Sequence, residues 1–253
     1  TYSEGFRPSG TNRLNRQARE SGIVPATYDS DTLTNFEAGF KSTLADGKIV
    51  LNGNFHTMNW DDFQSTSYIY DLLTVAFVQN VGQATISGLE LESYFNISDT
   101  FSASLMIALT DPEFKEDIYD LQGELSTPKG NQLAYVPTEQ FVMSMNKDFV
   151  IRNRDAYISY DHSYTGESYQ SSANTDTNAS YSLANLRFGV NPSSKGSPDA
   201  DDLLGFFQNA SVEVYLENVH DADPTLGIYD DFGDVRRTGS KPRTIGLRLR
   251  YRF

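Results

Sequence analysis

Two residue types that often carry catalysis, Cys and His, are absent or rare in this chain. The sequence contains no Cys, and its three His residues, His56, His162 and His220, are scattered. The lack of thiols excludes cysteine nucleophiles, thiolate zinc sites and disulfides, and three dispersed imidazoles do not suit the common histidine metal sites. His162 lies near Ser159 and Asp161, but a lone His on a tyrosine-rich strand more often serves packing. We therefore expect no enzyme activity, no bound metal and no cofactor.

Charged side chains recur at alternate positions in several segments, among them "GLELES", "ASVEVYLEN" and the terminal "TIGLRLRYRF". The charged residues that we expect to share one face are Glu90, Glu92, Arg187, Glu213, Glu217, Arg248 and Arg250. Opposite charges on neighbouring strands stabilise a sheet by about 0.2–1 kcal/mol per pair, which favours an internal ladder of ion pairs. A charged path for a substrate is the alternative, but the mixed signs argue against it.

The overall composition is acidic and aromatic. The chain has 20 Lys and Arg against 34 Asp and Glu, a formal net charge of −14, and 13% aromatic residues. Nucleic-acid recognition needs clustered cations, so we expect no nucleic-acid partner. The aromatic content argues against disorder. The longest purely apolar stretches, such as Leu105–Leu109, are far shorter than the roughly 20 residues that a transmembrane helix needs.

The elements that position these residues are strands, because apolar and polar residues alternate with a period of two almost everywhere. In 101–109, the odd-numbered positions are apolar, and Ser102 and Ser104 stand between them. The ten predicted strands span residues 1–7, 31–43, 48–65, 77–95, 101–110, 138–150, 155–167, 179–191, 208–219 and 241–253. In 13–20, the polar run "RLNRQARE" is expected to form at most a helical turn within a loop.

The connections between these strands alternate in length. Short turns such as "LADG" and "NISDT" follow long segments such as 8–30 and 111–137, with 192–207 as a long exception. Short turns at one end and long loops at the other are typical of a transmembrane β-barrel. A soluble β-sandwich or carbohydrate-binding domain shares the alternation, but its strands are usually about 5–6 residues, and most of these are about twice as long.

Aromatic residues gather near both strand ends, as two interfacial girdles would require. The set beside the short turns is Phe95, Phe101, Phe149, Phe206, Phe207 and Phe253, and the set toward the long loops is Trp60, Phe63, Tyr68, Tyr70, Tyr160 and Tyr164.

Four segments resemble the C-terminal half of a TonB-dependent outer-membrane receptor. They are "YSEGFRPSG", "SDTLTNFEAGFKSTLADGKIVLNGNFHTMNWDDFQ", "NVGQATISGLELE" and "TIGLRLRYRF". In that family, a barrel of twenty-two antiparallel strands surrounds an N-terminal plug domain, which carries the box that contacts TonB. The resemblance implies that residues 1–253 form about ten C-terminal strands of such an all-β, antiparallel transmembrane barrel, without the plug and the TonB box.

The resemblance also implies a function and a location. We expect a multi-pass protein of the cell outer membrane that takes part in TonB-energised uptake of a scarce nutrient such as a ferric siderophore, cobalamin or oligosaccharide. Its implied partners are outer-membrane lipid and lipopolysaccharide, its own plug and through it TonB, the outer-membrane assembly machinery, and a small-molecule ligand. A passive porin and a soluble β-rich binding or adhesion module are the alternatives.

Two sets of residues are candidates for specific roles. Tyr251 and Phe253, at the end of the last strand, resemble the C-terminal signal read by the assembly machinery. In and beside the long loops, cations and aromatic faces suit an anionic or ring-bearing ligand, and the candidates are Arg13, Arg16, Trp60, Tyr229 and Arg236. The loop cations could equally pair with acidic neighbours or lipopolysaccharide.

The acidic loops 111–120, 220–224 and 229–234 could bind Ca²⁺, but no loop has a fixed ligand order, so we interpret them as turns.

Overall fold

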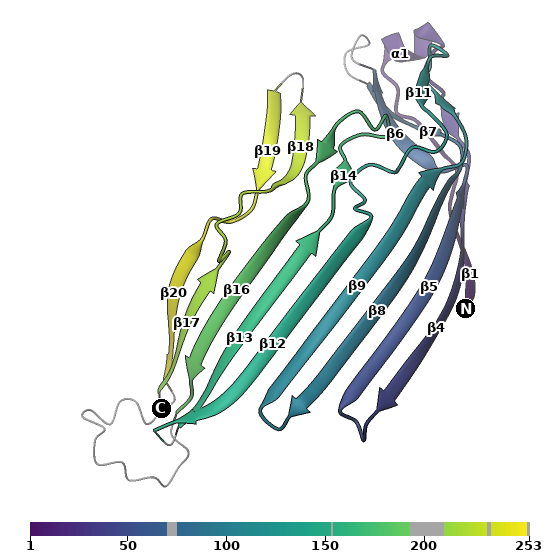
Figure 1. The fold of residues 1–253 in the computed structure, drawn as a ribbon. Helices are drawn as coiled ribbons and strands as arrows, with labels where there is room; N and C mark the ends of the chain where they lie inside the picture. The colour runs from purple at the N-terminus through teal and green to yellow at the C-terminus, as the bar shows by residue number, and fades with distance from the viewer. Residues whose placement is uncertain (70–74, 153, 193–209, 232–233, 252–253) are drawn as a thin grey trace.

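In a computed structural model, the protein is an antiparallel sheet of ten strands with a layer of loops at one end (Figure 1). The structure describes residues 1–69, 75–152, 154–192, 210–231 and 234–251, without the side chains of 229–231 and 234–235. Neighbours in the sheet follow the chain, in the order β1 (Tyr2–Arg7), β4 (Asp31–Leu44), β5 (Ile49–Asp61), β8 (Ala84–Ser98), β9 (Phe101–Phe114), β12 (Glu139–Ile151), β13 (Arg154–Thr165), β16 (Tyr181–Val190), β17 (Ala210–Glu217) and β20 (Thr244–Tyr251). This confirms the predicted all-β, antiparallel fold.

Two of the predicted strands are too long. The range 48–65 divides into β5 and β6 (Gln64–Ile69), and the range 77–95 divides into β7 (Val75–Asn80) and β8. Asp62 and Gly82 have positive φ angles of 53° and 94° at the two breaks, so the extended backbone is interrupted there. Because β6 and β7 pair with each other and not with the large sheet, they form a separate hairpin in the loop layer.

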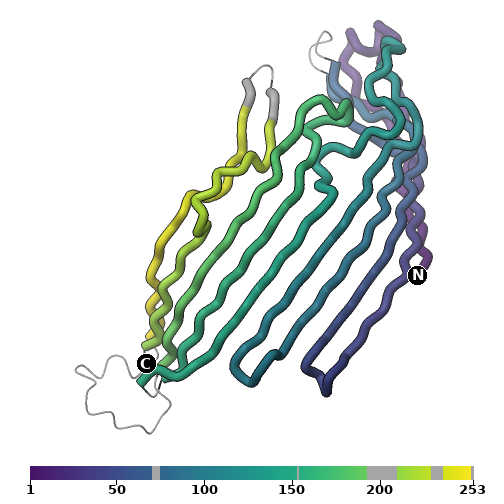
Figure 2. The backbone as a smooth tube through the Cα atoms, in the orientation of Figure 1, coloured from purple at the N-terminus to yellow at the C-terminus, as the bar shows by residue number. Residues whose placement is uncertain are grey.

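Each long connection at the loop end of the sheet that the structure describes contains a small two-stranded sheet of its own. Besides β6–β7, these are β2 (Gly10–Thr11) with β3 (Thr27–Tyr28), β10 (Ile118–Tyr119) with β11 (Leu125–Thr127), β14 (Ser168–Tyr169) with β15 (Thr177–Asn178), and β18 (Thr225–Asp231) with β19 (Asp234–Gly239). Figure 2 shows that these segments gather at one end of the sheet and that tight turns join β4 to β5 and β8 to β9 at the other end. The predicted long exception, 192–207, lies almost wholly outside the described residues.

One short helix, α1 (Arg16–Ser21), is present among the described residues, within the run expected to form a helical turn. Asn15 caps its N-terminus by accepting a hydrogen bond from the Ala18 N–H at 2.8 Å, and Gly22 ends it with a φ of 66°. Ala18 is buried with Val24, Val75 and Phe77 in a small apolar cluster of the loop layer. No helix in the described ranges is long and apolar enough to cross a membrane.

The strand register sorts the side chains of the sheet onto two faces, because directly opposed residues point the same way. On one face, Phe55 lies opposite Leu89, and Ile107 lies opposite both Leu91 and Phe141. No other part of the described chain covers this apolar face, and Leu89 is 51% exposed. A soluble sandwich would bury such a face under a second sheet, whereas a membrane strand presents it to lipid.

The apolar face becomes polar toward the loop layer. On β4, Phe36 is followed in that direction by Thr34 and Thr32, and on β9 Leu109 is followed by Asp111 and Glu113. The strands therefore continue beyond the apolar band on the loop side. Aromatic residues mark the opposite border of the band, since Phe95, Phe101 and Phe149 lie on the apolar face beside the tight turns. Phe206, Phe207 and Phe253 of that predicted girdle lie outside the described residues.

The other predicted girdle is partly wrong. Tyr160 and Tyr164 share the apolar face with Phe141. Trp60 instead lies opposite Leu33 and Ala84 on the polar face. Phe63 packs against Trp60, Tyr68 lies on the β6 hairpin in the loop layer, and Tyr70 is not described. Phe55 points to the apolar face and Trp60 lies five positions further along β5, so the alternation places the Trp60 ring on the polar face.

We predict that an arginine is tolerated very differently on the two faces of β9. Ile107→Arg would place a cation among Leu91 and Phe141, where exposure to the membrane midplane costs about 2–4 kcal/mol. Ser104→Arg would project from the polar face opposite Tyr94 and Ser144 and should cost little. The amount of folded protein in membranes and its denaturation midpoint measure the difference, and equal tolerance of the two variants would contradict a lipid-facing assignment.

Candidate functional site

A network of charges and tyrosines occupies the polar face near the C-terminal edge of the sheet. Arg248 forms an ion pair with Glu213, its direct partner across β17 and β20. The Tyr157 hydroxyl donates a hydrogen bond to the same carboxylate. On the neighbouring strands, Arg187 pairs with Asp161 at 2.9 Å. The Ser144 hydroxyl on β12 donates a hydrogen bond to the Asp161 carboxylate at 2.8 Å. The network therefore links five adjacent strands, which are β12, β13, β16, β17 and β20.

Glycines make room for the tyrosines of this network. The Tyr157 ring lies over Gly189, where an added Cβ would come within 2.3 Å of the ring. Tyr215 lies over Gly246 in the same way, and the Arg248 guanidinium sits 5.5 Å from the Tyr215 ring centroid, within reach of a cation–π contact. The rings thus lie along the sheet, and Tyr157 reaches Glu213 two strands away.

The strand register places all seven predicted charges on this polar face. Their pairing differs in part from a simple ladder. Arg187 bonds Asp161, which the sequence analysis did not single out, and Glu217 pairs with Lys241 at 3.1 Å. Glu90 and Glu92 lie opposite Asn54 and Asn52, and Arg250 lies opposite Ser211. The use of this face as a barrel lumen stays a prediction.

A second cluster centres on Asp31, at the loop end of β4. The Asp31 carboxylate is only 2% exposed and accepts hydrogen bonds from the Trp60 indole N–H at 2.9 Å and the Gln64 backbone N–H at 3.0 Å. The Arg7 guanidinium binds it through two nitrogen atoms and stacks 5.0 Å from the Trp60 ring centroid. Asp31 therefore joins the ends of β1, β4 and β5 to the start of β6.

The charge of Asp31 is stabilised by these donors. Asp31 lies beyond the apolar band, and its donors come from the loop ends of β1 and β5 and from the start of β6. Burial alone would raise the pKa of Asp31, but hydrogen bonds from Arg7, the Gln64 N–H and Trp60 outweigh burial and hold the pKa well below its usual range. Little in the sequence pattern points to this cluster, because Arg7 and Asp31 are separated by a long loop.

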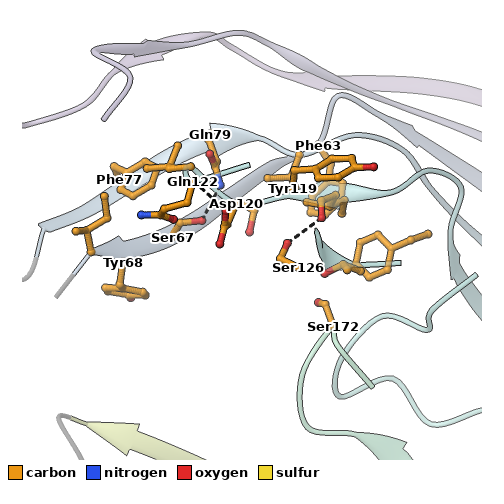
Figure 3. Close-up of a pocket in the computed structure, with 17 residues that line it drawn as sticks. Phe63, Ser67, Tyr68, Phe77, Gln79, Tyr119, Asp120, Gln122, Ser126 and Ser172 are labelled. Carbon is orange, nitrogen blue, oxygen red and sulfur yellow. Dashed lines mark hydrogen bonds between the residues drawn. The ribbon is translucent and has the colours of Figure 1, made fainter. Parts of the chain in front are cut away.

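Aromatic stacking extends the Asp31 cluster into the loop layer. The Trp60 ring is 5.3 Å from Phe63, and Phe63 stacks on Phe114 at 5.8 Å. Phe63 and Phe114 form one wall of a cavity of about 430 Å³ between the hairpins β6–β7 and β10–β11. Figure 3 shows side chains from both hairpins around this cavity. Its size falls within the range of small-molecule sites, roughly 300–1,000 Å³, and we call it the hairpin pocket.

The structure does not bring the five predicted ligand residues together. Arg13 precedes α1 and Arg16 is its first residue, and both side chains are exposed. Arg16 pairs with Glu20 at 2.7 Å. Arg236 lies on β19, on the opposite side of the loop layer from α1 (Figure 1). Tyr229 is its backbone partner on β18, but its side chain is not described. Trp60 is engaged by Asp31 on the polar face. A ligand-binding role for this set stays a prediction.

The remaining sequence candidates are an assembly signal and the acidic loops. Tyr251 lies on the apolar face opposite Ala210, whereas Phe253 is outside the described residues, so their signalling role is still a prediction. Acidic loop residues cap turns or form ion pairs: Asp120 accepts the N–H groups of Gln122 and Glu124, each at 2.9 Å, and Asp223 pairs with Arg237 at 3.0 Å. In the described part of the chain, no three acidic or His side chains group as metal ligands would.

Comparison with known proteins identifies the class. The family model described as TonB dependent receptor-like, beta-barrel, matches residues 1–219. The chain belongs to this family of TonB-dependent receptor barrels. No curated protein sequence is similar enough to count as a match.

Solved structures share the fold at low sequence identity. The ferric yersiniabactin uptake receptor FyuA from Yersinia pestis superposes with a TM-score of 0.73 and 18% identity, covering 100% of this chain and 34% of that chain. The siderophore receptor PiuA from Acinetobacter baumannii has a TM-score of 0.70 and 16% identity, covering 98% and 32%. The ferric preacinetobactin receptor BauA from the same organism has a TM-score of 0.67 and 12% identity, covering 99% and 33%. The chain thus spans about a third of the length of these proteins.

We predict that Asp31→Asn weakens the attachment of the loop layer. The substitution keeps the shape but removes the charge that Arg7, Trp60 and Gln64 bind, and charge-assisted hydrogen bonds contribute about 1.5–3 kcal/mol. A loss of about 2 kcal/mol in the free energy of unfolding is therefore expected, with faster proteolysis of the loops. Asp29→Asn, a change at an exposed carboxylate two residues earlier, is the control and should leave both measurements unchanged.

The effect of Asp31→Asn should also depend on pH. Because the folded-state pKa of Asp31 is lowered, its stabilising contribution is complete above the unfolded value, about 3.9, and is lost as the pH falls below it. The stability difference between the wild type and the variant should be constant from about pH 8 to pH 5 and shrink below about pH 4. A difference that stays constant in acid would show that the charge of Asp31 contributes nothing.

Proposed function

We propose that this chain is part of an outer-membrane receptor that takes up a scarce nutrient with energy delivered by TonB. The observation that carries the proposal is the ten-stranded antiparallel meander, with an uncovered apolar face and a charged opposite face, in a chain that belongs to the TonB-dependent receptor barrels. Such a sheet needs lipid on one side and a polar interior on the other. Two of the similar solved structures are named as receptors for ferric ligands and a third as a siderophore receptor, which supports nutrient uptake as the task.

Within this proposal, each face of the sheet has a partner. The apolar face contacts outer-membrane lipid, with lipopolysaccharide at the loop-side border. The network around Glu213 and Arg187 faces the barrel interior, where it contacts the receptor's own plug domain, which in turn engages TonB. Tyr251 and Phe253 are read by the assembly machinery. Residues 1–253 would then supply about ten of the twenty-two strands, at the C-terminal end of the barrel.

Enzyme activity is not part of the proposal. Ser159 and Asp161 lie on the polar face, opposite Arg187 and Asn185. His162 lies on the apolar face, where its ring packs 5.5 Å from Phe141. A Ser–His–Asp arrangement needs the three side chains within hydrogen-bond reach of each other, so these neighbours in sequence do not form one.

The decisive measurement for the proposed function is whether nutrient uptake requires TonB. The full-length receptor, expressed in a host that lacks its own nutrient receptors, should accumulate its nutrient in cells with TonB. Deletion of TonB should reduce accumulation to background and leave binding at the cell surface unchanged. Labelled ferric siderophores, cobalamin and oligosaccharides serve as the trial nutrients. Uptake that persists without TonB would favour a passive porin, and a purified receptor that stays monodisperse without detergent would favour a soluble module.

The predicted loop residues can be tested in the same assay. If Arg13, Arg16 and Arg236 bind the nutrient, replacing all three with Ala weakens uptake and leaves the amount of receptor in the membrane unchanged. Replacing Phe253 should have the reverse effect, because a damaged assembly signal lowers the amount of receptor without altering ligand affinity. Wild-type affinity in the triple variant would place the binding site elsewhere.

A further inference from the structure

We propose that the hairpin pocket binds an uncharged saccharide and discriminates against anionic ligands. The inference rests on the proposed function, since it assigns a ligand class to one site of a nutrient receptor. It depends on three properties of the pocket: the charge of its lining, its exposed aromatic rings and its hydrogen-bonding groups.

The lining offers no cation to an anionic ligand. Among the described residues that line the pocket, none is Lys or Arg, and the one carboxylate is Asp120. Asp120 is already held by two backbone N–H groups. Carboxylates and phosphates are normally bound by Arg or Lys, so a negatively charged ligand would meet a lining of the wrong sign.

Four cations at the loop end of the sheet are already bound by carboxylates. Lys115 pairs with Glu113 at 2.5 Å, and Arg7 is engaged by Asp31 below the pocket. Elsewhere in the loop layer, Arg237 pairs with Asp223 and Arg243 with Asp221. Recruiting one of these cations to an anionic ligand would require breaking an existing ion pair.

Exposed aromatic rings on two hairpins suit the apolar faces of sugar rings. Tyr68 on β6 is 57% exposed and Tyr119 on β10 is 55% exposed, and both line the pocket. Phe77 is 2% exposed and Phe114 3% exposed, so these two rings form a rigid base and the tyrosines remain available to a ligand (Figure 3). Aromatic rings provide a large contact area at a small cost in conformational entropy.

The polar groups of the lining can both donate and accept hydrogen bonds, as the hydroxyl groups of a saccharide do. They are mainly hydroxyls and side-chain amides, among them Ser65, Ser67, Gln79, Gln122, Ser126 and Ser172. Ser67 and Gln79 are already joined at 3.0 Å, and Ser126 donates to the Ile118 carbonyl at 3.0 Å. Hydroxyls and amides retain further donor and acceptor capacity after one such bond, so the lining matches a neutral polyol better than it matches a charged group.

A second cavity of the loop layer has the same character. It lies between the β14–β15 hairpin and the segment that leads into β18, and its described lining includes Gln170, Asn178, Ser180, Tyr181 and Asp223. Again no Lys or Arg is among the described lining residues. Two separate cavities whose described walls lack cations and are rich in hydroxyls and amides indicate that this lining is a general property of the loop layer.

The test measures binding to the purified full-length receptor in detergent. The neutral probes are maltohexaose, cellohexaose, xylohexaose and mannohexaose. The anionic probes are the hexamers of galacturonate and guluronate and a ferric tricatecholate complex. We expect binding of at least one neutral hexaose and of no anionic probe. Tyr68→Ala and Tyr119→Ala should each weaken the neutral affinity about tenfold, since each removes a stacking surface, whereas Tyr119→Phe should change it by less than about threefold.

Two further variants separate a role in binding from a role in folding. Gln122→Lys should weaken neutral binding and permit binding of the acidic hexamers, because it adds the missing cation to the lining. Ile23→Ala truncates an apolar side chain of the loop layer that is 49% exposed and lies outside the pocket lining, and it should leave affinity unchanged.

The outcomes distinguish this inference from the proposed function. Binding of the anionic probes, absence of binding to every neutral hexaose, or full neutral affinity in Tyr119→Ala would overturn the saccharide pocket. TonB-dependent uptake of an anionic ferric complex would overturn it and leave the proposed function intact. Neutral binding that is lost in Tyr119→Ala, in a receptor whose uptake does not require TonB, would uphold the pocket and refute the proposed function.

Discussion

The strand register is the constraint on which the rest of the structure depends. Side chains alternate between the faces of a strand, so a slip of one residue exchanges every side chain between them. In this sheet, a slip would move Arg248 and Glu213 into the apolar band and would turn Leu247 and Val214 toward the charged face. The resulting cost, several kcal/mol for each misplaced charge in lipid, selects one register for each strand. Because ten strands share this requirement, their two faces are fixed together.

The loop layer depends on a different interaction. The described connections at the loop end each form a hairpin, and Asp31 attaches the β6–β7 hairpin to the sheet. A single buried carboxylate binds an arginine, an indole and a backbone amide from three segments. Ring contacts from Trp60 through Phe63 to Phe114 connect this cluster to the wall of the pocket. The position of the hairpin pocket is therefore determined by contacts that start at the end of the sheet and not by the hairpins alone.

Most of the sheet could be predicted from the sequence, because alternation is a local property. The pattern in Phe101–Leu109 identifies both the strand and its two faces without knowledge of its neighbours. The hairpins β6–β7 and β10–β11 could not be predicted in this way, since their strands are short and the break before β6 depends on the left-handed backbone of Asp62. The Asp31 cluster and the pocket were also hidden, because they join residues from separate connections. Arg187 shows the same limit: its face was predictable, but its partner Asp161 depends on how neighbouring strands are staggered.

The extension of the strands beyond the apolar band determines how the molecule meets its surroundings. From Phe36 to Asp31, β4 rises about 16 Å along its axis at roughly 3.3 Å per residue, and the usual strand tilt reduces this to about 12 Å of height. In a membrane, the hairpins would stand above the lipid headgroups, at the level of surface polysaccharides. A long polymer could therefore present one chain end to the hairpins while the rest of it remained outside the cell, and antibodies or phages could reach α1 without penetrating the bilayer.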